Sequence, residues 1–348
     1  MNEFERARLR LFLTFFLFAV FIFCVVFGIV KVCRQLNPPD VNQNQPEIIA
    51  AEQNISPVKN KAPIEKAVAK KTVPSAKEKT DAQEFKLDDS KAFRGILKSW
   101  RRYKLPRCGI LVDVDSGRVL WSYHADKVVP IASLSKMLTV YIALEEIKKS
   151  RGVITLDNKV KITKSSGIGR EGSFGFVPGQ VFSVRDLMKA ATVRSANDAA
   201  SSLAVYFGNG EASFVKMMNQ EAQKLGMKNS RFLNPHGLPA GKKDNVSTMN
   251  DLIILSLKLL KNPDYMQWAK MNGAKIGNKT IVSTNNLMRK RRCPGVDGMK
   301  TGYTRRAGFC LAFSCLRKGR RMVGVVAGFP SSTDRENFVT ALLNWAYR

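Results

Sequence analysis

Histidine is nearly absent from this sequence of 348 residues, and its cysteines show no metal-binding spacing. Only His124 and His236 occur, which excludes a multi-histidine metal site and leaves a Ser-His-Asp triad no other histidine to use. We interpret both as structural, because His236 lies in the turn-like segment NPHGL and His124 follows a predicted strand. A serine nucleophile in this chain would therefore need lysine as its base. No Cys-x-x-C spacing occurs, which argues against a zinc ribbon or a thioredoxin-type site, and neither a metal nor a cofactor is expected.

Acidic residues are scarce as well. Asp and Glu number 28 against 57 Lys and Arg, and 43 of the basic residues but only 17 of the acidic ones follow residue 92. Such a positive surface attracts polyanions, among them anionic lipid and anionic wall polymer. The chain has neither zinc-finger spacing nor an RNA-binding signature with interleaved aromatic residues, so no nucleic-acid partner is expected. Four later cysteines leave both disulfides and buried free thiols open: Cys108, Cys293, Cys310 and Cys315.

The N-terminal part carries a candidate membrane anchor. Residues 11–30 form an uncharged run of 20 residues, about the length that spans a bilayer as a helix. Arg6, Arg8 and Arg10 precede it and favour a cytoplasmic N-terminus. A cleaved signal peptide is the alternative, but its apolar core is usually about 7 to 15 residues long and ends at small residues, whereas this run ends in GIVKVC. We therefore predict a retained single-pass anchor within residues 1–34.

The next segment, residues 35–92, has a different composition. Pro, Lys, Gln, Asn and Ala dominate it and aromatic residues are nearly absent, so nothing in it offsets the entropy of ordering. We predict a disordered linker that tethers residues 93–348 to the membrane.

Residues 93–348 show strand patterns at both ends and helical patterns between them. The strand signals cover 108–114, 119–124, 296–304, 307–315 and 322–329. Helical spacing of apolar residues covers 137–149, 184–193, 197–207, 211–226, 249–260 and 333–347. The segment RKGR is expected to form the turn between the last two strands, and Thr333 with Glu336 is expected to form a capping box for the last helix. This order predicts an α+β fold in which a sheet carries helices and a mostly helical lobe lies beside it.

The segment PIASLSKMLT contains the first candidate for chemistry. Ser133 lies three residues before Lys136, so both share one face of a helix that begins there, whereas Ser135 points elsewhere. Lys136 falls in the first turn among apolar residues, where the helix dipole and desolvation both favour the neutral amine that a base requires. An N-cap serine followed by a lysine with a solvated ammonium group is the alternative, and this segment alone leaves it open.

Two further motifs follow in order. Ser195 and Asn197 stand in SANDAA at a helix start, and Lys300, Thr301 and Gly302 stand in a predicted strand. Ser-x-x-Lys, Ser-x-Asn and Lys-Thr-Gly in this order are the signature set of penicillin-binding proteins and class A β-lactamases. Together with ILVDVDSGRVLW, FLNPHGL and STNNL, they make the chain from about residue 93 onward resemble the serine-type D-alanyl-D-alanine carboxypeptidases, the low-molecular-mass penicillin-binding proteins. The resemblance implies a penicillin-binding/β-lactamase-like transpeptidase fold, with a five-stranded antiparallel sheet, flanking helices and a mostly helical lobe.

The resemblance also implies catalytic roles. Ser133 would attack the carbonyl between the two terminal D-alanines of a peptidoglycan stem peptide, forming an acyl-enzyme and releasing D-alanine, while Lys136 takes its proton. Ser195 would relay a proton to the leaving amine. Backbone amides of Ser133 and Tyr303 would form an oxyanion hole, in which each donor is worth roughly 3 to 4 kcal/mol.

Five residues would bind the substrate. The resemblance implies that Asn197 holds the peptide amide, that Lys300 supplies positive potential for the terminal carboxylate, and that Thr301 hydrogen-bonds to it. Lys-Thr-Gly on an edge strand suits a substrate that docks as an added strand, with Gly302 allowing close approach of the backbone. Tyr303 contributes its backbone amide.

Other functions stay open beside this one. A D,D-endopeptidase that cuts peptidoglycan cross-links would use the same residues and differ in the shape of its cleft. A β-lactamase would need a glutamate in a Glu-x-x-x-Asn setting, which is missing between Asn197 and Lys300, so β-lactam antibiotics are expected to inhibit as slowly hydrolysed acyl-adducts. A non-catalytic, basic wall-binding protein would not need the intact set of motifs.

The resemblance adds an expected location and expected partners. The protein is expected at the bacterial cell membrane, with its catalytic domain on the periplasmic or extracellular side. Many relatives carry a C-terminal β-rich domain and an amphipathic anchor, and the N-terminal helix is expected to replace that anchor here. Stem peptides, β-lactam inhibitors, the membrane and anionic wall polymers are the expected partners.

Overall fold

The computed structural model describes residues 86–87, 103–167, 169 and 171–348. The predicted anchor lies outside this range, and so does the predicted linker apart from Lys86–Leu87. Within the described part of the chain, no helix combines the length and the apolar character that crossing a bilayer requires.

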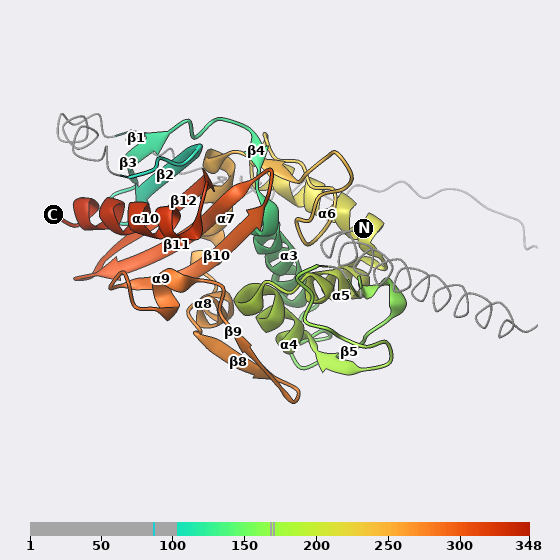
Figure 1. Cartoon of the computed structure of the whole chain (residues 1–348). Coiled ribbons are helices and arrows are strands. Elements are labelled where there is room, and N and C mark those ends of the chain that lie inside the picture. The colour runs from blue at the N-terminus through green and yellow to red at the C-terminus, as the bar shows by residue number, and fades with distance from the viewer. Residues whose placement is uncertain (1–85, 88–102, 168, 170) are drawn as a thin grey trace, which may run out of the picture. The chain divides into compact units, whose positions relative to one another are not determined.

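A six-stranded sheet is the centre of the fold (Figure 1). Its order is β1-β3-β2-β12-β11-β10, and all neighbouring strands are antiparallel except β1 and β3. The strands span Lys86–Leu87 (β1), Cys108–Asp113 (β2), Arg118–Tyr123 (β3), Val296–Thr304 (β10), Gly308–Arg317 (β11) and Arg320–Phe329 (β12). The five strands predicted from the sequence are confirmed, and β1 adds a short parallel strand from the segment predicted as linker.

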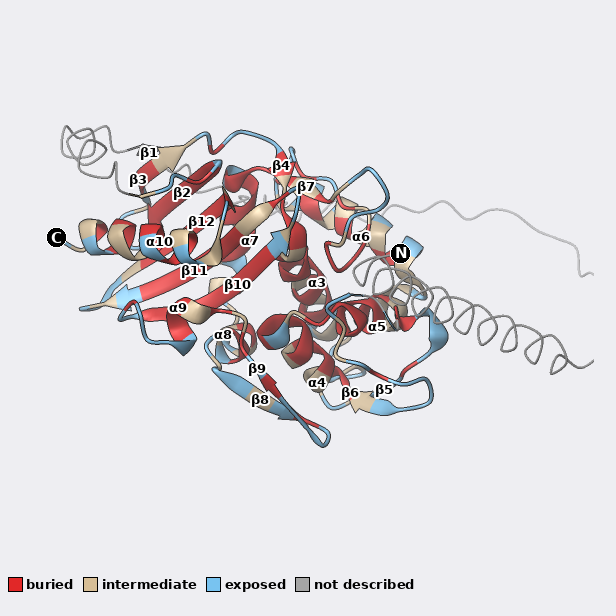
Figure 2. Cartoon of the chain, in the orientation of Figure 1, coloured by how far each residue is buried: buried red, intermediate tan, exposed pale blue. Residues whose placement is uncertain are grey.

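Alternating apolar residues bury both faces of this sheet. On β12, Val323 and Val325 belong to one core together with helix α7 (Met249–Leu260), whereas Met322 belongs to a second core with helix α10 (Ser332–Ala346). Residues two apart on a strand face the same side, so the period-two spacing decides which core each side chain enters. Figure 2 shows the buried strands with α10 and α7 packed on them.

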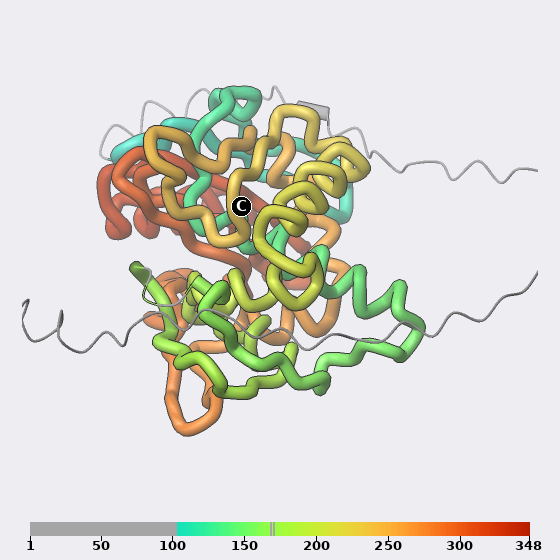
Figure 3. The backbone as a smooth tube through the Cα atoms, turned by 90° about the vertical axis from the view of Figure 1, so that its right-hand side faces the viewer, coloured from blue at the N-terminus to red at the C-terminus, as the bar shows by residue number. Residues whose placement is uncertain are grey.

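The second lobe consists of helices and short hairpins beside the sheet (Figures 1 and 3). Its helices span Ser135–Lys149 (α3), Val184–Lys189 (α4), Asn197–Gly208 (α5), Glu211–Lys224 (α6) and Pro263–Ala269 (α8). Asn286–Arg289 (α9) instead contributes Leu287 and Met288 to the core that contains α10. The short strand pairs are Val129–Pro130 (β4) with Val246–Ser247 (β7), Lys159–Lys161 (β5) with Val181–Ser183 (β6), and Gly273–Ile276 (β8) with Lys279–Val282 (β9). All six helices predicted from the sequence are present, as α3, α4 with the π-helical turn that follows it, α5, α6, α7 and α10. The hairpin of β8 and β9 projects away from the sheet in both views.

The turn between β11 and β12 forms where RKGR predicts it. Its two central residues, Lys318 and Gly319, have φ values of 49° and 77°. A two-residue turn with positive φ at both positions matches the right-handed twist of the strands that it joins.

The predicted capping box of α10 is wrong. Ser331 is the N-cap residue, and its hydroxyl accepts a hydrogen bond from the backbone N–H of Asp334 at 3.0 Å. Glu336 is buried and forms an ion pair with Arg292 at 3.0 Å. A buried carboxylate needs a cationic partner, and this requirement outweighs the local capping role that its spacing from Thr333 suggested.

Candidate active site

The predicted nucleophile lies on a strained turn. Ser133 occupies the 3₁₀ turn Ala132–Leu134, which leads directly into α3. Ala132 has a φ of 49°, a left-handed conformation that residues other than glycine seldom adopt. Gly237 packs so closely that a Cβ at its position would lie 2.0 Å from the carbonyl oxygen of Ala132. Packing against the segment that contains Gly237 therefore holds the turn in this conformation.

Lys136 is the buried neighbour of Ser133. Its Nζ lies 2.9 Å from Ser133 Oγ, 2.6 Å from Asn197 Oδ1 and 2.5 Å from the carbonyl oxygen of His236. No described carboxylate forms an ion pair with it. A neutral amine donates two hydrogen bonds and accepts one, which suits two carbonyl acceptors and one hydroxyl donor. The arrangement can therefore hold an amine whose lone pair faces the Ser133 hydroxyl.

Burial lowers the pKa of both lysines in the site. Lys136 is 1% exposed, and removal from water, with a smaller contribution from Lys300, holds its pKa well below the ordinary value. Burial of Lys300, with Arg335 nearby, lowers its pKa to about 7. The lowered pKa of Lys136 favours its neutral amine, and near pH 7 about half of the Lys300 side chains carry a charge.

Ser135 has a separate environment. Its buried hydroxyl donates to the carbonyl oxygen of Ala132 at 2.8 Å and accepts from Asn245 Nδ2 at 2.8 Å. Asn245 also receives the backbone N–H of Leu233 on its Oδ1 at 2.7 Å. The structure therefore places Ser133, not Ser135, beside Lys136. Ser135 instead stabilises the turn through its hydrogen bonds to Ala132 and Asn245.

The Ser-Ala-Asn motif begins where a π-helical turn, Ala190–Arg194, ends. Ser195 has a φ of 64° and is half-buried, and its hydroxyl makes no hydrogen bond within the described part of the chain. Asn197 Oδ1 accepts from Lys136, and its Nδ2 donates to the carbonyl oxygen of Glu171. Asn197 and Lys136 are therefore in direct contact, whereas Ser195 reaches neither lysine of the site.

Asp198 supports the motif in a way that the sequence analysis missed. Its buried carboxylate accepts the backbone N–H groups of Phe174 at 2.8 Å, Gly175 at 2.9 Å and Phe176 at 3.1 Å. Its charge also raises the pKa of Lys136, against the larger effect of burial. No sequence signal separates this aspartate from an ordinary acidic residue in a first helical turn, because its partners lie more than 20 residues away.

The Lys-Thr-Gly motif lies on β10, and its predicted position at the sheet edge is confirmed. Lys300 is 2% exposed, and its Nζ donates to the carbonyl oxygen of Thr301 at 2.9 Å. Thr301 Oγ1 lies 2.6 Å from Thr284 Oγ1. A Cβ on Gly302 would lie 3.3 Å from the backbone nitrogen of Ser133. The absence of a side chain there lets the strand lie against the nucleophile turn.

Tyr303 directly follows this close contact. Its side chain is 56% exposed and stacks on Phe309 of β11, with ring centroids 4.2 Å apart. Tyr303 directly follows Gly302, the residue of β10 that lies against the turn that carries Ser133.

The segment NPHGL contributes through its backbone, which the sequence analysis did not foresee. Asn234 Oδ1 accepts the N–H of Gly237 at 2.6 Å, and Asn234 Nδ2 donates to the carbonyl oxygen of Leu238 at 2.8 Å. His236 Nδ1 accepts the N–H of Leu238, and its carbonyl oxygen accepts a hydrogen bond from Lys136. The residues Asn, Pro and Gly predicted a turn here, but nothing in the sequence indicated that the His236 carbonyl group would contact Lys136.

Comparison with known proteins gives this geometry a family. A family model described as D-alanyl-D-alanine carboxypeptidase matches residues 107–331. The chain belongs to the D-alanyl-D-alanine carboxypeptidase family. It is similar to the D-alanyl-D-alanine carboxypeptidase DacF of Bacillus subtilis, with 30% identity over 246 residues, which cover 69% of this chain and 62% of that protein. It is also similar to a D-alanyl-D-alanine endopeptidase of Pseudomonas aeruginosa, with 35% identity over 209 residues, 58% of this chain and 64% of that protein.

Solved structures agree with the family. The chain is similar to penicillin-binding protein D2 from Listeria monocytogenes in its ampicillin-bound form, with a TM-score of 0.63 and 31% identity, covering 70% of this chain and 98% of that one. The D-alanyl-D-alanine carboxypeptidase DacD from Francisella tularensis gives a TM-score of 0.64 at 26% identity, covering 70% of each chain. The family resemblance and the fold class expected from the sequence are confirmed. The chain spans about six-tenths of the length of curated relatives such as DacF, at 62%.

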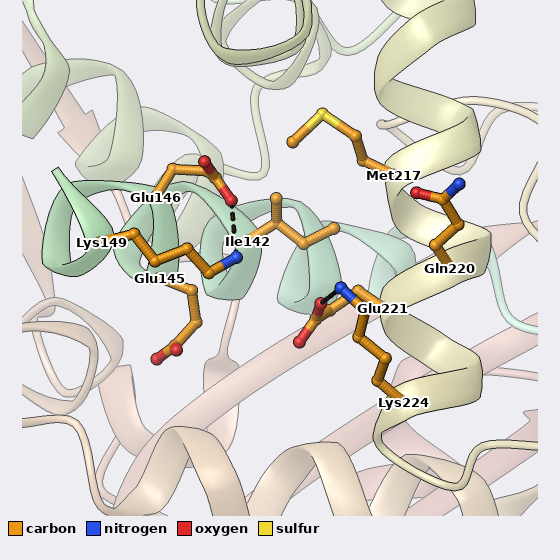
Figure 4. A pocket seen from close by; sticks show the side chains of 8 residues that line it. All are labelled: Ile142, Glu145, Glu146, Lys149, Met217, Gln220, Glu221 and Lys224. Atoms are coloured by element: carbon orange, nitrogen blue, oxygen red, sulfur yellow. Dashed lines mark hydrogen bonds and ion pairs between the residues drawn. The ribbon is translucent and has the colours of Figure 1, made fainter. Parts of the chain in front are cut away.

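Two other features of this carboxypeptidase-family chain lie outside the site. The groove in Figure 4, between α3 and α6, contains no residue of the predicted site. The four described cysteines are buried free thiols: Cys108, Cys293, Cys310 and Cys315. Among the described residues, no group of three or more His, Cys, Asp and Glu side chains is arranged to hold a metal ion.

Proposed function

We propose that the chain is a serine-type D-alanyl-D-alanine carboxypeptidase that removes the terminal D-alanine from peptidoglycan stem peptides. The observation that carries the proposal is the 2.9 Å contact between Ser133 Oγ and the buried Nζ of Lys136. Lys136 has a lowered pKa and no ion-pair partner among the described carboxylates, so its amine is free to accept a proton. Membership of the family supports the reaction class.

Acylation follows from this contact. Ser133 Oγ attacks the carbonyl carbon of the penultimate D-alanine while its proton passes to Lys136 Nζ. The amides of Ser133 and Tyr303 stabilise the oxyanion, and collapse of the tetrahedral intermediate breaks the peptide bond. The proton that Lys136 accepted passes to the departing D-alanine amine. The Ser195 hydroxyl, which makes no hydrogen bond to either lysine of the described site, relays it once the bound substrate or a water lies between them. Water then attacks the ester carbonyl and regenerates the Ser133 hydroxyl.

Substrate binding uses the edge of β10. The peptide lies along this strand as an added strand, and its terminal carboxylate meets Thr301 and the charge of Lys300. Asn197 Oδ1 fixes the base, and one N–H of Nδ2 donates to Glu171, so the second N–H of Nδ2 is left to hold the carbonyl oxygen of the peptide amide. The small separation between Gly302 and the Ser133 turn supports this docking, because it brings the strand edge next to the nucleophile.

Two measurements test the proposal. Purified protein is incubated with peptidoglycan fragments, and the products are identified by mass spectrometry, with free D-alanine expected. A fluorescent penicillin is then used to label the protein, and the labelled residue is mapped. Wild type should carry the adduct on Ser133, Ser133→Ala should carry none, and Ser135→Ala should keep most of its labelling. No label on the wild type, or equal loss in both variants, would refute the assignment.

A D,D-endopeptidase is the second candidate. The similarity to the endopeptidase of Pseudomonas aeruginosa favours it, since that relative shares 35% identity with this chain. Cleavage of cross-linked dimers into monomers without release of D-alanine would select this function.

We infer that β-lactams inhibit the protein by acylating Ser133. The structural similarity to penicillin-binding protein D2 in its ampicillin-bound form supports this inference. Slow recovery of activity after removal of the free drug is expected, whereas rapid turnover of the drug would indicate a β-lactamase.

We further propose that the protein is held at the bacterial cell membrane by residues 11–30, with the catalytic domain outside the cytoplasm. The uncharged run and the arginines before it support this location. Fractionation of cells expressing the full chain tests it, and recovery of the protein shortened by a signal peptide would contradict a retained anchor.

Anionic wall polymer is the proposed partner of the basic surface. The exposed segment 289–292 leads to Pro294, whose carbonyl oxygen accepts a hydrogen bond at 2.7 Å from Arg317 Nε in the segment 317–321. Of their eight cations, three pair with carboxylates and five have no ion pair with a described residue. Binding to a phosphodiester polymer should fall steeply between low and physiological salt, and a flat response would discard the proposal.

A further inference from the structure

We propose that Thr284 is a positioning residue for the terminal carboxylate of the substrate, acting through the hydroxyl of Thr301. The inference deepens the proposed carboxypeptidase function and rests on it. It assigns to Thr284 the task of fixing where the Thr301 proton points before the substrate arrives.

The position of Thr284 links two walls of the site. The residue lies between β9 and α9, and its Oγ1 lies 2.6 Å from Thr301 Oγ1 on β10. Its backbone N–H donates to the carbonyl oxygen of Val193 at 3.1 Å, in the π-helical turn that precedes Ser195. One residue thus contacts both the Lys-Thr-Gly strand and the turn of the Ser-Ala-Asn motif.

The hydrogen-bond inventory of the two threonines decides what they can do. Each hydroxyl has one proton and can accept up to two hydrogen bonds. At 2.6 Å one of the two protons lies between the oxygens, and the other is left for a further acceptor. Thr301 Oγ1 and Thr284 Oγ1 have no other hydrogen-bond partner among the described residues. One of the two hydroxyl groups can therefore donate a hydrogen bond to a bound ligand.

A carboxylate is the acceptor that suits this proton. A hydroxyl that donates to a charged oxygen makes a shorter and stronger bond than one that donates to a neutral group. Lys300 stands next to Thr301 in the chain and carries its charge on about half of the molecules near pH 7. When Thr284 donates to Thr301, the Thr301 proton is directed away from Thr284 and toward the substrate. Without Thr284, the Thr301 hydroxyl would be free to rotate.

The test compares a variant that removes the hydroxyl with one that keeps it. Thr284→Val preserves the shape and removes the hydroxyl, and Thr284→Ser retains it. Thr280→Val makes the same change at an exposed position of β9 and serves as the control. Each protein is assayed by single-turnover acylation with a peptide ending in D-Ala-D-Ala and with the same peptide carrying a C-terminal amide.

Loss of carboxylate recognition is the expected result. Thr284→Val should lower kcat/KM about tenfold for the carboxylate peptide, mainly through KM, because the Thr301 hydroxyl loses the hydrogen bond that orients it toward the carboxylate. Its rate with the amide peptide should stay within about threefold of wild type, and both Thr284→Ser and Thr280→Val should behave as wild type.

Two outcomes would overturn the inference while leaving the proposed function intact. Equal losses with both peptides would show that Thr284 only supports the fold of the segment. An unchanged rate with the carboxylate peptide would show that Thr301 does not depend on Thr284. If wild type itself cleaves neither peptide, the proposed carboxypeptidase function is refuted, and this inference is refuted with it.

Discussion

Helix α3 carries Lys136 near its N-terminal end and Lys149 as its last residue, and these two lysines have opposite properties. Lys136, near the N-terminal end, is buried without a carboxylate partner among the described residues, and burial lowers its pKa well below the ordinary value. Lys149, near the C-terminal end, lies 2.8 Å from Glu146 in an ion pair that raises its pKa. Figure 4 shows Lys149 in the groove between α3 and α6, which also holds Glu145 and Glu221.

Surroundings, not residue type, decide which of these lysines can act as a base. Both side chains sit on one rigid helix, about 20 Å apart at 1.5 Å per residue. Removal from water and the positive end of the helix dipole favour a neutral amine at one end, and a nearby carboxylate favours an ammonium ion at the other. The lack of an ion pair does not single out Lys136, because five cations in 289–292 and 317–321 also have none among the described residues. Its burial sets it apart from them.

Removing each lysine should give the largest contrast. Lys136→Met should slow acylation of Ser133 by penicillin about 100- to 10,000-fold, the usual contribution of a positioned base. Lys149→Met should leave the acylation rate unchanged, because its ion pair faces the groove shown in Figure 4. Stopped-flow measurement of labelling compares the two. Similar rates for both variants would break the distinction between the ends of α3.

A second change would give Lys136 the kind of partner that Lys149 already has. Asn197→Asp places a carboxylate about where Asn197 Oδ1 lies, 2.6 Å from Lys136 Nζ. The pKa of Lys136 should rise, so acylation near pH 7 should fall roughly 10- to 100-fold and recover as the pH is raised.

Matched variants separate this effect from damage to the site. Asn197→Ala also loses the hydrogen bond to Glu171, but it should show no recovery at high pH. Glu146→Gln should leave the acylation profile of wild type unchanged. A loss in Asn197→Asp that does not depend on pH would mean that the charge of Lys136 is not what controls the rate.

The pH dependence of peptide cleavage sharpens the comparison with Lys300. Its pKa is lowered to about 7, so its charge is present below that pH and disappears above it. For wild type, kcat/KM should therefore fall about tenfold per pH unit above pH 7, since this parameter follows the free enzyme. Lys300→Arg should hold its charge and remove this alkaline decline. Lys300→Ala should have a low kcat/KM at all pH values, and no loss would disprove the carboxylate role.

Removing the charge of Asp198 should give the smallest effect on acylation. Asp198→Asn weakens the contacts to the N–H groups of Phe174, Gly175 and Phe176, and unfolding should become easier by about 1 to 3 kcal/mol. Because Asp198 raises the pKa of Lys136, its loss should also shift the acid limb of acylation to lower pH. Urea unfolding and a pH profile measure both. A shift of the limb to higher pH would contradict the account.

The larger elements of the fold were readable from the sequence for a physical reason. Each predicted strand or helix has one or two faces in a core, so its apolar residues repeat with period two or with helical spacing. The hairpin of β8 and β9 escaped because most of its residues are exposed and leave no such pattern. The helix α8 escaped because seven residues are too few to show one.

For the site, the sequence identified residues but not their backbone conformations or contacts. The motifs named Ser133, Lys136 and Asn197, which the structure brings into contact. They carried no trace of the positive φ at Ala132 or of the His236 carbonyl group, because long-range packing imposes both. A contact between two residues that are far apart in the sequence leaves no periodic pattern, so it can be recognised only once the fold is known.

The charge state of Lys136 is the most direct measure of the central claim, that this buried amine is the base for Ser133. Titration of protein labelled with ¹³C-lysine, followed by NMR, gives the pKa of each side chain, and Lys136→Arg and Lys149→Arg assign the two signals. We expect the pKa of Lys136 to lie well below the ordinary value for lysine and that of Lys149 to lie above it. If both lysines titrate together near the value of a free lysine, Lys136 is protonated at neutral pH and the account is contradicted.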